Sequence, residues 1–136
     1  MQTSLKWTGK TGFIGETESG NKVKMDISVE KGGENTGPAP MELLLLSLGG
    51  CTGIDVVTIL AKKRVKLGGL EIRLEAEQAE NHPKVFKKIK MEFFFHGEDL
   101  KNSDLKRAIE LSQEKYCSVT AMLNKTAELS YTWKIL

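Results

Sequence analysis

The stretch from Met41 to Arg64 constrains the fold of this chain more than any other feature. Pro40 suits the first turn of a helix, and the acidic Glu42 favours the positive end of the helix dipole. The apolar side chains that follow point in every direction around the predicted helix: Leu43 to Leu46, Leu48, Ile54, Val56, Val57, Ile59 and Leu60. A helix that is apolar on all sides must be covered on all sides. Because one small sheet covers only one face, we predict a homodimer with this helix at its centre.

The same helix is not expected to span a membrane. Gly49-Gly50, Thr52 and Asp55 interrupt its apolar run, and charged residues close both ends. The 136 residues fit one domain, 1–136, and a net charge of +2 gives no reason to expect nucleic acid as a partner. Met1 to Lys10 lacks the apolar core of a secretory signal, so we expect a cytoplasmic protein whose thiols are kept reduced.

Alternating apolar and polar residues predict strands on either side of the helix. Leu5 and Trp7 alternate with polar neighbours, as does the run from Val23 through Met25 and Ile27 to Val29. Two longer strands follow, from Leu70 to Glu77 and from Lys88 to Phe95. The lysines of the second, with Lys84 and Lys87 before it, are expected to pair with the glutamates of the first rather than to bind nucleic acid.

The last third of the chain predicts two more helices and a strand. Ser103 is a candidate N-cap for a helix, the chain breaks around Cys117, and a short helix continues to Asn124. Leu129, Tyr131, Trp133 and Ile135 then alternate as in a strand. We therefore expect an α+β fold with antiparallel sheets packed on a long, buried central helix.

The two cysteines, Cys51 and Cys117, are the candidate reactive residues. If Gly49-Gly50 interrupt the helix, Cys51 lies near a fresh helix N-terminus, which lowers the pKa of a thiol. The same argument applies to Cys117, just before the last short helix. On spacing alone, both cysteines could equally be small buried hydrophobic residues. The cysteines and histidines show none of the close pair spacings that zinc sites use, so we expect no metal and no cofactor.

Two motifs carry a resemblance to a known family. They are Pro40-Met41-Glu42-Leu43-Leu44 with Gly49-Gly50-Cys51, and Ser112-Gln113-Glu114-Lys115-Tyr116-Cys117-Ser118-Val119, and they resemble the OsmC/Ohr family. The predicted order of strands and helices is similar to that family over nearly the whole chain. In that family a proline and a glutamate open the central helix, one cysteine lies inside it, and a second precedes a late short helix. Family members are intertwined homodimers, which agrees with a helix that one chain cannot cover.

The resemblance implies a redox function in stress response. Cys51 would attack an organic hydroperoxide and become a sulfenic acid, Cys117 would condense with it to a disulfide, and an external dithiol, lipoyl in the family, would reduce that bond. The protein would then be a thiol-dependent peroxidase, an antioxidant oxidoreductase. The alternative that we keep is a non-catalytic redox sensor or small-molecule-binding protein using the same thiols.

The sequence departs from the family pattern and so indicates a side branch. The family uses an arginine from the N-terminal third, yet no arginine precedes Arg64, and Lys24 and Lys31 are the candidate substitutes. The family glutamate directly follows the proline, whereas here Met41 does and Glu42 comes one residue later, a rotation of about 100° on a helix. Asp55, four residues after Cys51, shares its helical face. It could accept a proton, pair with a lysine across the dimer or form a structural ion pair.

Overall fold

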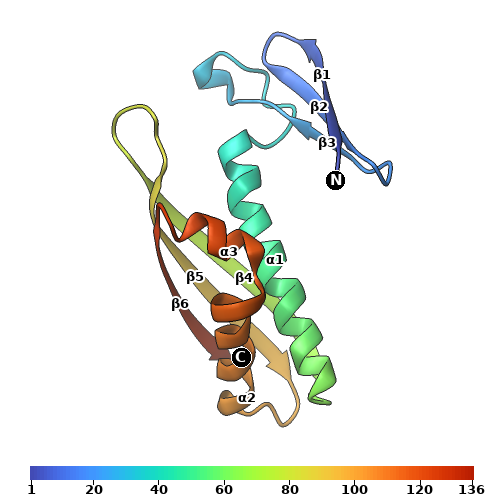
Figure 1. The fold of residues 1–136 in the computed structure, drawn as a ribbon, viewed down its shortest axis with the longest axis vertical. Helices are drawn as coiled ribbons and strands as arrows, with labels where there is room; N and C mark the ends of the chain where they lie inside the picture. The colour runs from blue at the N-terminus through green and yellow to red at the C-terminus, as the bar shows by residue number, and fades with distance from the viewer. The chain divides into compact units, whose positions relative to one another are not determined.

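The computed structural model describes residues 1–136, and the chain divides into two compact units, 1–44 and 45–136 (Figure 1). The expectation of a single domain over residues 1–136 remains a prediction.

The first unit is a three-stranded antiparallel sheet in the order β1-β2-β3. Its strands are β1 (Thr3–Gly9), β2 (Gly12–Thr17) and β3 (Lys22–Met25). The predicted alternation is confirmed for β1 and β3, but the strand expected to run on to Val29 ends at Met25. Val29 instead begins a 3-10 turn, η1 (Val29–Lys31). None of the large buried apolar residues belongs to this unit, and Trp7 remains 66% exposed.

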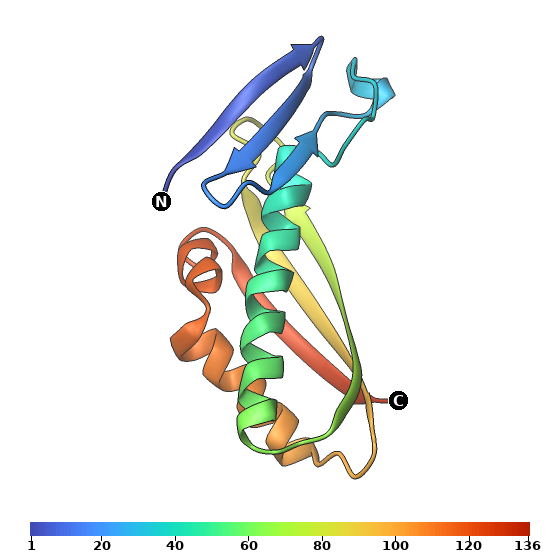
Figure 2. The same cartoon turned by 90° about the vertical axis from the view of Figure 1, so that its right-hand side faces the viewer.

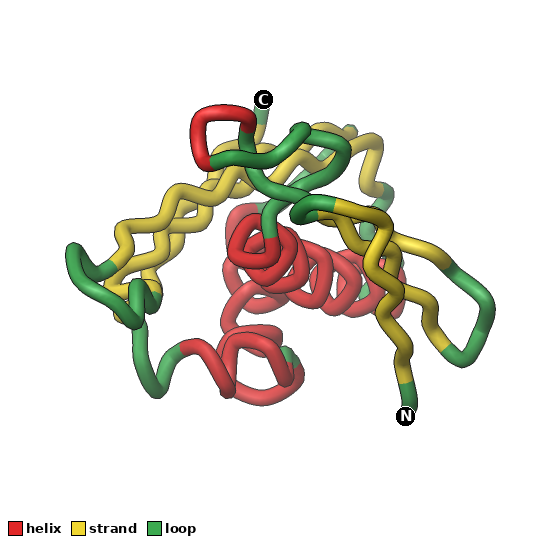
Figure 3. The backbone as a smooth tube through the Cα atoms, turned by 90° about the horizontal axis from the view of Figure 1, so that it is seen from above, coloured by secondary structure: helices red, strands yellow, loops and turns green.

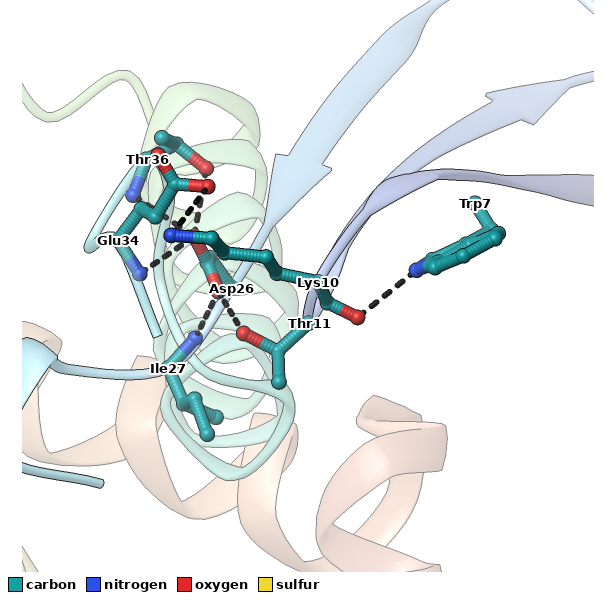
Figure 4. A network of polar contacts seen from close by, with 7 residues as sticks. All are labelled: Trp7, Lys10, Thr11, Asp26, Ile27, Glu34 and Thr36. Carbon is teal, nitrogen blue, oxygen red and sulfur yellow. Dashed lines mark hydrogen bonds and ion pairs between the residues drawn. The ribbon is translucent and has the colours of Figure 1, made fainter. Parts of the chain in front are cut away.

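The polar centre of the first unit is Asp26 (Figure 4). The Asp26 carboxylate accepts hydrogen bonds from the Thr11 hydroxyl at 2.6 Å, the Ile27 amide at 2.7 Å and the Thr36 hydroxyl at 2.8 Å. The Glu34 and Thr36 amides donate to it at 3.2 Å. These hydrogen bonds, led by that from Thr11, hold the pKa of Asp26 well below its usual range. A buried carboxylate thus ties the loop after β3 to the sheet.

The predicted long helix is α1 (Pro40–Lys62), and it runs without a break. Near its start the Glu42 carboxylate accepts a hydrogen bond from the Ala39 amide at 2.9 Å. By length and composition alone α1 could cross a membrane, with a mean hydropathy of 2.0, although core helices of soluble proteins pass the same test. Within one chain it buries a single stripe, Leu48, Gly49, Thr52, Val56 and Leu60. One chain therefore does not bury α1 on all sides.

The second unit contains a sheet in the order β4-β5-β6, with β4 (Leu67–Gln78), β5 (Phe86–Gly97) and β6 (Glu128–Ile135). The first two strands are antiparallel, and β6 runs parallel to β5. The expectation of purely antiparallel sheets is therefore wrong for β6, because the intervening helices return the chain to the starting end of β5. The register places Glu75 opposite Lys90 and Glu77 opposite Lys88, so the charged rows face each other as expected. The ion pair that Lys90 makes, however, is with Glu92 of its own strand, at 2.7 Å.

Helices cover one face of this sheet (Figures 2 and 3). They are the later part of α1, α2 (Asn102–Leu111) and α3 (Ser118–Leu123). The helix predicted to start near Ser103 begins at Asn102, with Lys101 in the cap position. On the covered face of β5, Met91, Phe93 and Phe95 are fully buried. Gly49 lets α1 approach closely, since a Cβ there would lie 2.8 Å from Leu74 Cδ1 of β4.

A candidate dithiol site

The two cysteines meet in the second unit. Cys51 lies in the middle of α1, and Cys117 caps the N-terminus of α3. Both thiols are free, and their Sγ atoms lie within 4.8 Å of each other. The geometry brings the two residues singled out in the sequence into one site.

A π turn, η2 (Ser112–Tyr116), delivers Cys117 to this position. It continues α2 directly, and the Cys117 amide closes it by donating to the Ser112 carbonyl at 2.8 Å. The backbone then becomes extended at Cys117 before α3 starts. Such turns add one residue to a helix and often occur at functional sites. The sequence indicated a break at Cys117 but not the π geometry before it.

The Cys117 sulfur is buried and accepts hydrogen bonds. The Thr120 amide donates to it at 3.3 Å and the Thr52 hydroxyl at 3.6 Å, while the side chain is only 3% exposed. Burial by itself raises the pKa of this thiol, but the hydrogen bonds from Thr120, Cys51 and Thr52 together lower it below the ordinary thiol value. The helix-start environment predicted for Cys117 is thus present.

Cys51 lies in a different environment. It is half-buried, and burial raises the pKa of its thiol. Its hydrogen bond to Cys117 and the negative charge of Asp55 add to this rise, and the Val119 amide opposes it. The helix N-terminus proposed for Cys51 does not exist, because Gly49-Gly50 leave α1 unbroken. Cys51 is therefore the more accessible thiol, with the higher pKa of the two.

A chain of three polar side chains holds the buried sulfur in place. The Gln113 amide donates to the Thr52 hydroxyl oxygen at 3.1 Å, which leaves the Thr52 proton directed at Cys117. The Thr120 hydroxyl in turn donates to the Gln113 carbonyl oxygen at 3.2 Å. Sequence reasoning missed this network, although Thr52 directly follows Cys51 and Gln113 stands in the second motif.

Replacing Gln113 tests the network. In Gln113→Ala the hydroxyls of Thr52 and Thr120, both buried, each lose a partner, so we expect the free energy of unfolding to fall by about 2 kcal/mol. Oxidation of the thiol pair to a disulfide should also slow. Chemical denaturation and timed thiol titration measure the two effects. The matched control is Glu114→Ala, an exposed neighbour in the same turn, which should change stability by less than about 0.5 kcal/mol. Equal effects of the two variants would contradict the network.

Asp55 belongs to the same cluster. As predicted from the four-residue spacing, it faces the side of α1 that carries Cys51, and a carboxylate oxygen lies within 4.8 Å of both sulfurs. Its partner within the chain is the Ser112 hydroxyl, which donates to Oδ2 at 2.8 Å, in place of the expected ion pair. A lysine from a second chain remains a prediction.

The other sequence candidates lie in the first unit. Lys24 lies on β3, Lys31 ends the 3-10 turn, and both are exposed. Glu42 binds the backbone at the start of its own helix. Their approach to Cys51 remains a prediction.

A cavity of about 500 Å³ adjoins the cluster in the second unit. Asp55 lines it together with the apolar or aromatic side chains of Ile54, Ile59, Leu111 and Tyr116. Lys62 and Lys63 also line it. A largely apolar cavity therefore opens beside a carboxylate that reaches both sulfurs.

Comparison with known proteins identifies the family. A model of the OsmC-like protein family matches residues 32–132. This chain is a member of the OsmC-like family. The protein YhfA of Escherichia coli K12 is 38% identical over 136 residues, covering 100% of this chain and 98% of the relative.

Solved structures of similar fold agree with that assignment. A hypothetical protein from Aquifex aeolicus VF5 is 34% identical with a TM-score of 0.87, over 99% of this chain and 95% of that one. An organic hydroperoxide resistance protein OsmC from Legionella pneumophila is 17% identical with a TM-score of 0.70, covering 98% and 97%, and shows the fold alone. Family membership indicates a redox or hydroperoxide-stress role for this OsmC-like protein.

Proposed function

We propose that this OsmC-like protein reduces organic hydroperoxides by thiol chemistry at Cys51 and Cys117. The observation that carries the proposal is the pair of free sulfurs within 4.8 Å of each other, one half-buried and one buried. A pair at this distance needs only a small movement to reach the bond length of about 2.05 Å in a disulfide.

The reaction has two steps within the protein. The Cys51 thiolate attacks one oxygen of the hydroperoxide, the O–O bond breaks, and an alcohol leaves after taking up a proton. Cys51 is then a sulfenic acid. The Cys117 sulfur attacks it, water leaves, and a Cys51–Cys117 disulfide forms. An external dithiol, for which a lipoyl group is our candidate, returns both thiols by exchange.

The cavity beside Asp55 favours an organic substrate. Its apolar lining from Ile54, Ile59 and Leu111 suits a hydrocarbon group, which hydrogen peroxide lacks. The Legionella pneumophila protein of similar fold is named for resistance to organic hydroperoxides, the same substrate class.

A non-catalytic redox sensor or small-molecule binder is the second candidate. The raised pKa of Cys51 and the absence of any arginine before Arg64 favour it, because both features reduce the supply of thiolate at the attacking sulfur. Lys24 and Lys31 are the residues that could compensate, and Glu42 could assist, although it lies one residue beyond the position of the family glutamate.

The deciding experiment is consumption of peroxide by the reduced protein. We expect reduced wild type to consume about one equivalent of cumene hydroperoxide per chain and to lose both thiols. Turnover should continue when dihydrolipoamide is supplied, and hydrogen peroxide should react more slowly. Thiol loss without continued turnover under any dithiol would select the sensor, and no thiol loss with any peroxide would exclude both redox functions.

We further propose that the protein works as a homodimer in the cytoplasm. The supporting features are the apolar residues that one chain leaves exposed on α1, including Leu46, Ile54 and Val57. The family resemblance implies that a second copy of this chain covers these exposed residues of α1. A reducing compartment keeps the thiols available between turnovers.

A further inference from the structure

Three ligand atoms of metal-binding type converge at the dithiol site. The Sγ atoms of Cys51 and Cys117 and a carboxylate oxygen of Asp55 all lie within 4.8 Å of one another. The fold achieves this although the two cysteines are 66 positions apart in the sequence. The four-residue spacing brings Asp55 close to Cys51, but nothing in the sequence spacing indicates that Cys117 joins them.

The distances between these three ligand atoms are close to those in a tetrahedral zinc site. Zinc binds cysteine sulfur at about 2.3 Å and carboxylate oxygen at about 2.0–2.2 Å, so ligands around it lie about 3.5–3.8 Å apart. The distances between the three atoms, which are at most 4.8 Å, would have to shorten by no more than about 1.3 Å to reach that separation. Two thiolates and a carboxylate are ligands that zinc accepts, and three protein ligands leave a fourth position for water.

Hydrogen bonds already orient two of the three ligands. Ser112 donates to Asp55 Oδ2 at 2.8 Å and so orients the carboxylate. Thr120 and Thr52 donate to the Cys117 sulfur and stabilise its negative charge. Partners of this kind fix ligand orientation in metal sites. Cys51 is half-buried and Asp55 lines the adjoining cavity, so two of the three ligands are not sealed from solvent.

We propose that the reduced protein binds one Zn²⁺ per chain through Cys51, Cys117 and Asp55, and that the metal withholds both thiols from peroxide. The proposal departs from the expectation of no metal, which considered only the spacing of cysteines and histidines along the sequence. Binding converts each thiol to a metal-bound thiolate and releases its proton to solvent. The disulfide form has no thiolate to offer, so metal binding and disulfide formation exclude each other. The zinc site goes beyond the peroxidase activity and is tested without any peroxide.

Titration with Zn²⁺, and with Co²⁺ as its coloured substitute, tests the site. The reduced wild-type protein under anaerobic conditions should bind one ion per chain and show the absorption band of thiolate-to-cobalt charge transfer. The same protein oxidised to the Cys51–Cys117 disulfide should bind neither ion at this site. A stoichiometry other than one, no thiolate band, or equal binding by the oxidised protein would overturn the proposal.

Variants assign the ligands. Cys51→Ser and Cys117→Ser should lose the wild-type thiolate band intensity, and each should bind Zn²⁺ at least about a hundredfold more weakly. Asp55→Asn, which can still accept the Ser112 hydrogen bond, should weaken binding by at least about tenfold. Ser112→Ala, which removes only the orienting hydroxyl, should weaken it by about tenfold. The matched control Glu114→Gln, an exposed carboxylate of the π turn, should bind as wild type.

Two results would overturn the assignment. The first is wild-type affinity in Asp55→Asn, and the second is equal weakening in Glu114→Gln. Circular dichroism of each metal-free variant establishes that it is folded, so a loss of binding reports on the ligands. Peroxide turnover in wild type, measured separately with chelator present, keeps the outcome for zinc independent of the outcome for the peroxidase.

Discussion

A Cys117→Ser variant treated with an organic hydroperoxide is expected to accumulate a sulfenic acid on Cys51. It should complete one turnover and then stop, because no second sulfur is present to form the intramolecular disulfide. Cys51→Ser should consume peroxide no faster than the background reaction. Mass spectrometry after trapping with a sulfenic-acid reagent locates the oxidised residue.

Two properties of the thiols compete in this prediction. The pKa of Cys117 is lowered by its hydrogen bonds and that of Cys51 is raised by burial, so Cys117 holds the larger share of thiolate. Cys51, however, is the more accessible to peroxide, since it is half-buried whereas Cys117 is only 3% exposed. Reaction requires both a thiolate and contact with the peroxide, and a sealed sulfur has no contact. We therefore expect Cys51 to react first, and slowly.

The controls use the lysines of the first unit. Lys24→Ala or Lys31→Ala should slow the first step further if that lysine replaces the family arginine, and Lys22→Ala, on the same strand as Lys24, serves as the matched comparison. Trapped sulfenic acid on Cys117 in Cys51→Ser, with Cys51 inert in Cys117→Ser, would reverse the assignment. Inertness of both cysteines would leave the non-catalytic function.

Ile54→Glu is expected to convert the protein from a dimer to a monomer. The Ile54 side chain is 68% exposed in a single chain although it lies in the most apolar helix. If a second copy covers it, the new carboxylate loses its water on association, which costs about 3–5 kcal/mol when it finds no partner. Such a cost weakens the dimer more than about a hundredfold. Sedimentation at low micromolar concentration should give twice the 15.1 kDa chain mass for wild type and the single mass for the variant.

Lys106→Glu provides the control for charge alone. It introduces the same residue on α2, at a position that one chain leaves exposed, and should remain dimeric. A well-folded wild-type monomer at these concentrations, or a dimer in Ile54→Glu, would contradict the assembly.

Local patterns in the sequence predicted most of the elements. The alternation in β4 and β5, the apolar run of α1 and the break before α3 each depend on neighbours within a few residues, and all were confirmed. The strand expected to reach Val29 ends at Met25, because the Asp26 carboxylate binds Ile27 and Thr36 of the loop that follows. Alternation of apolar and polar residues does not encode these side-chain hydrogen bonds. Gly49-Gly50 could have interrupted the helix, yet α1 is unbroken, and Gly49 lets Leu74 of β4 approach it closely.

The site was predicted only in part. Cys51, Cys117 and Asp55 were identified from their positions, and the four-residue spacing placed Asp55 on the face that carries Cys51. Thr52 and Gln113 were missed because a π turn, rather than an α-helical one, turns Gln113 toward α1. No periodic pattern indicates such a turn. The parallel pairing of β6 was missed for a similar reason, since its partner is chosen by a crossover of three helical segments.

That parallel pairing also bears on the order in which the second unit folds. The strands β4 and β5 follow each other in the chain, whereas β6 pairs with β5 only after α2, η2 and α3 have been crossed. Contacts that are distant in sequence form more slowly than local ones, and until they form one edge of β5 is unpaired. The crossover between β5 and β6 carries Cys117, whereas Cys51 precedes β4. We therefore expect the β4–β5 hairpin to form before β6 closes the sheet beside it.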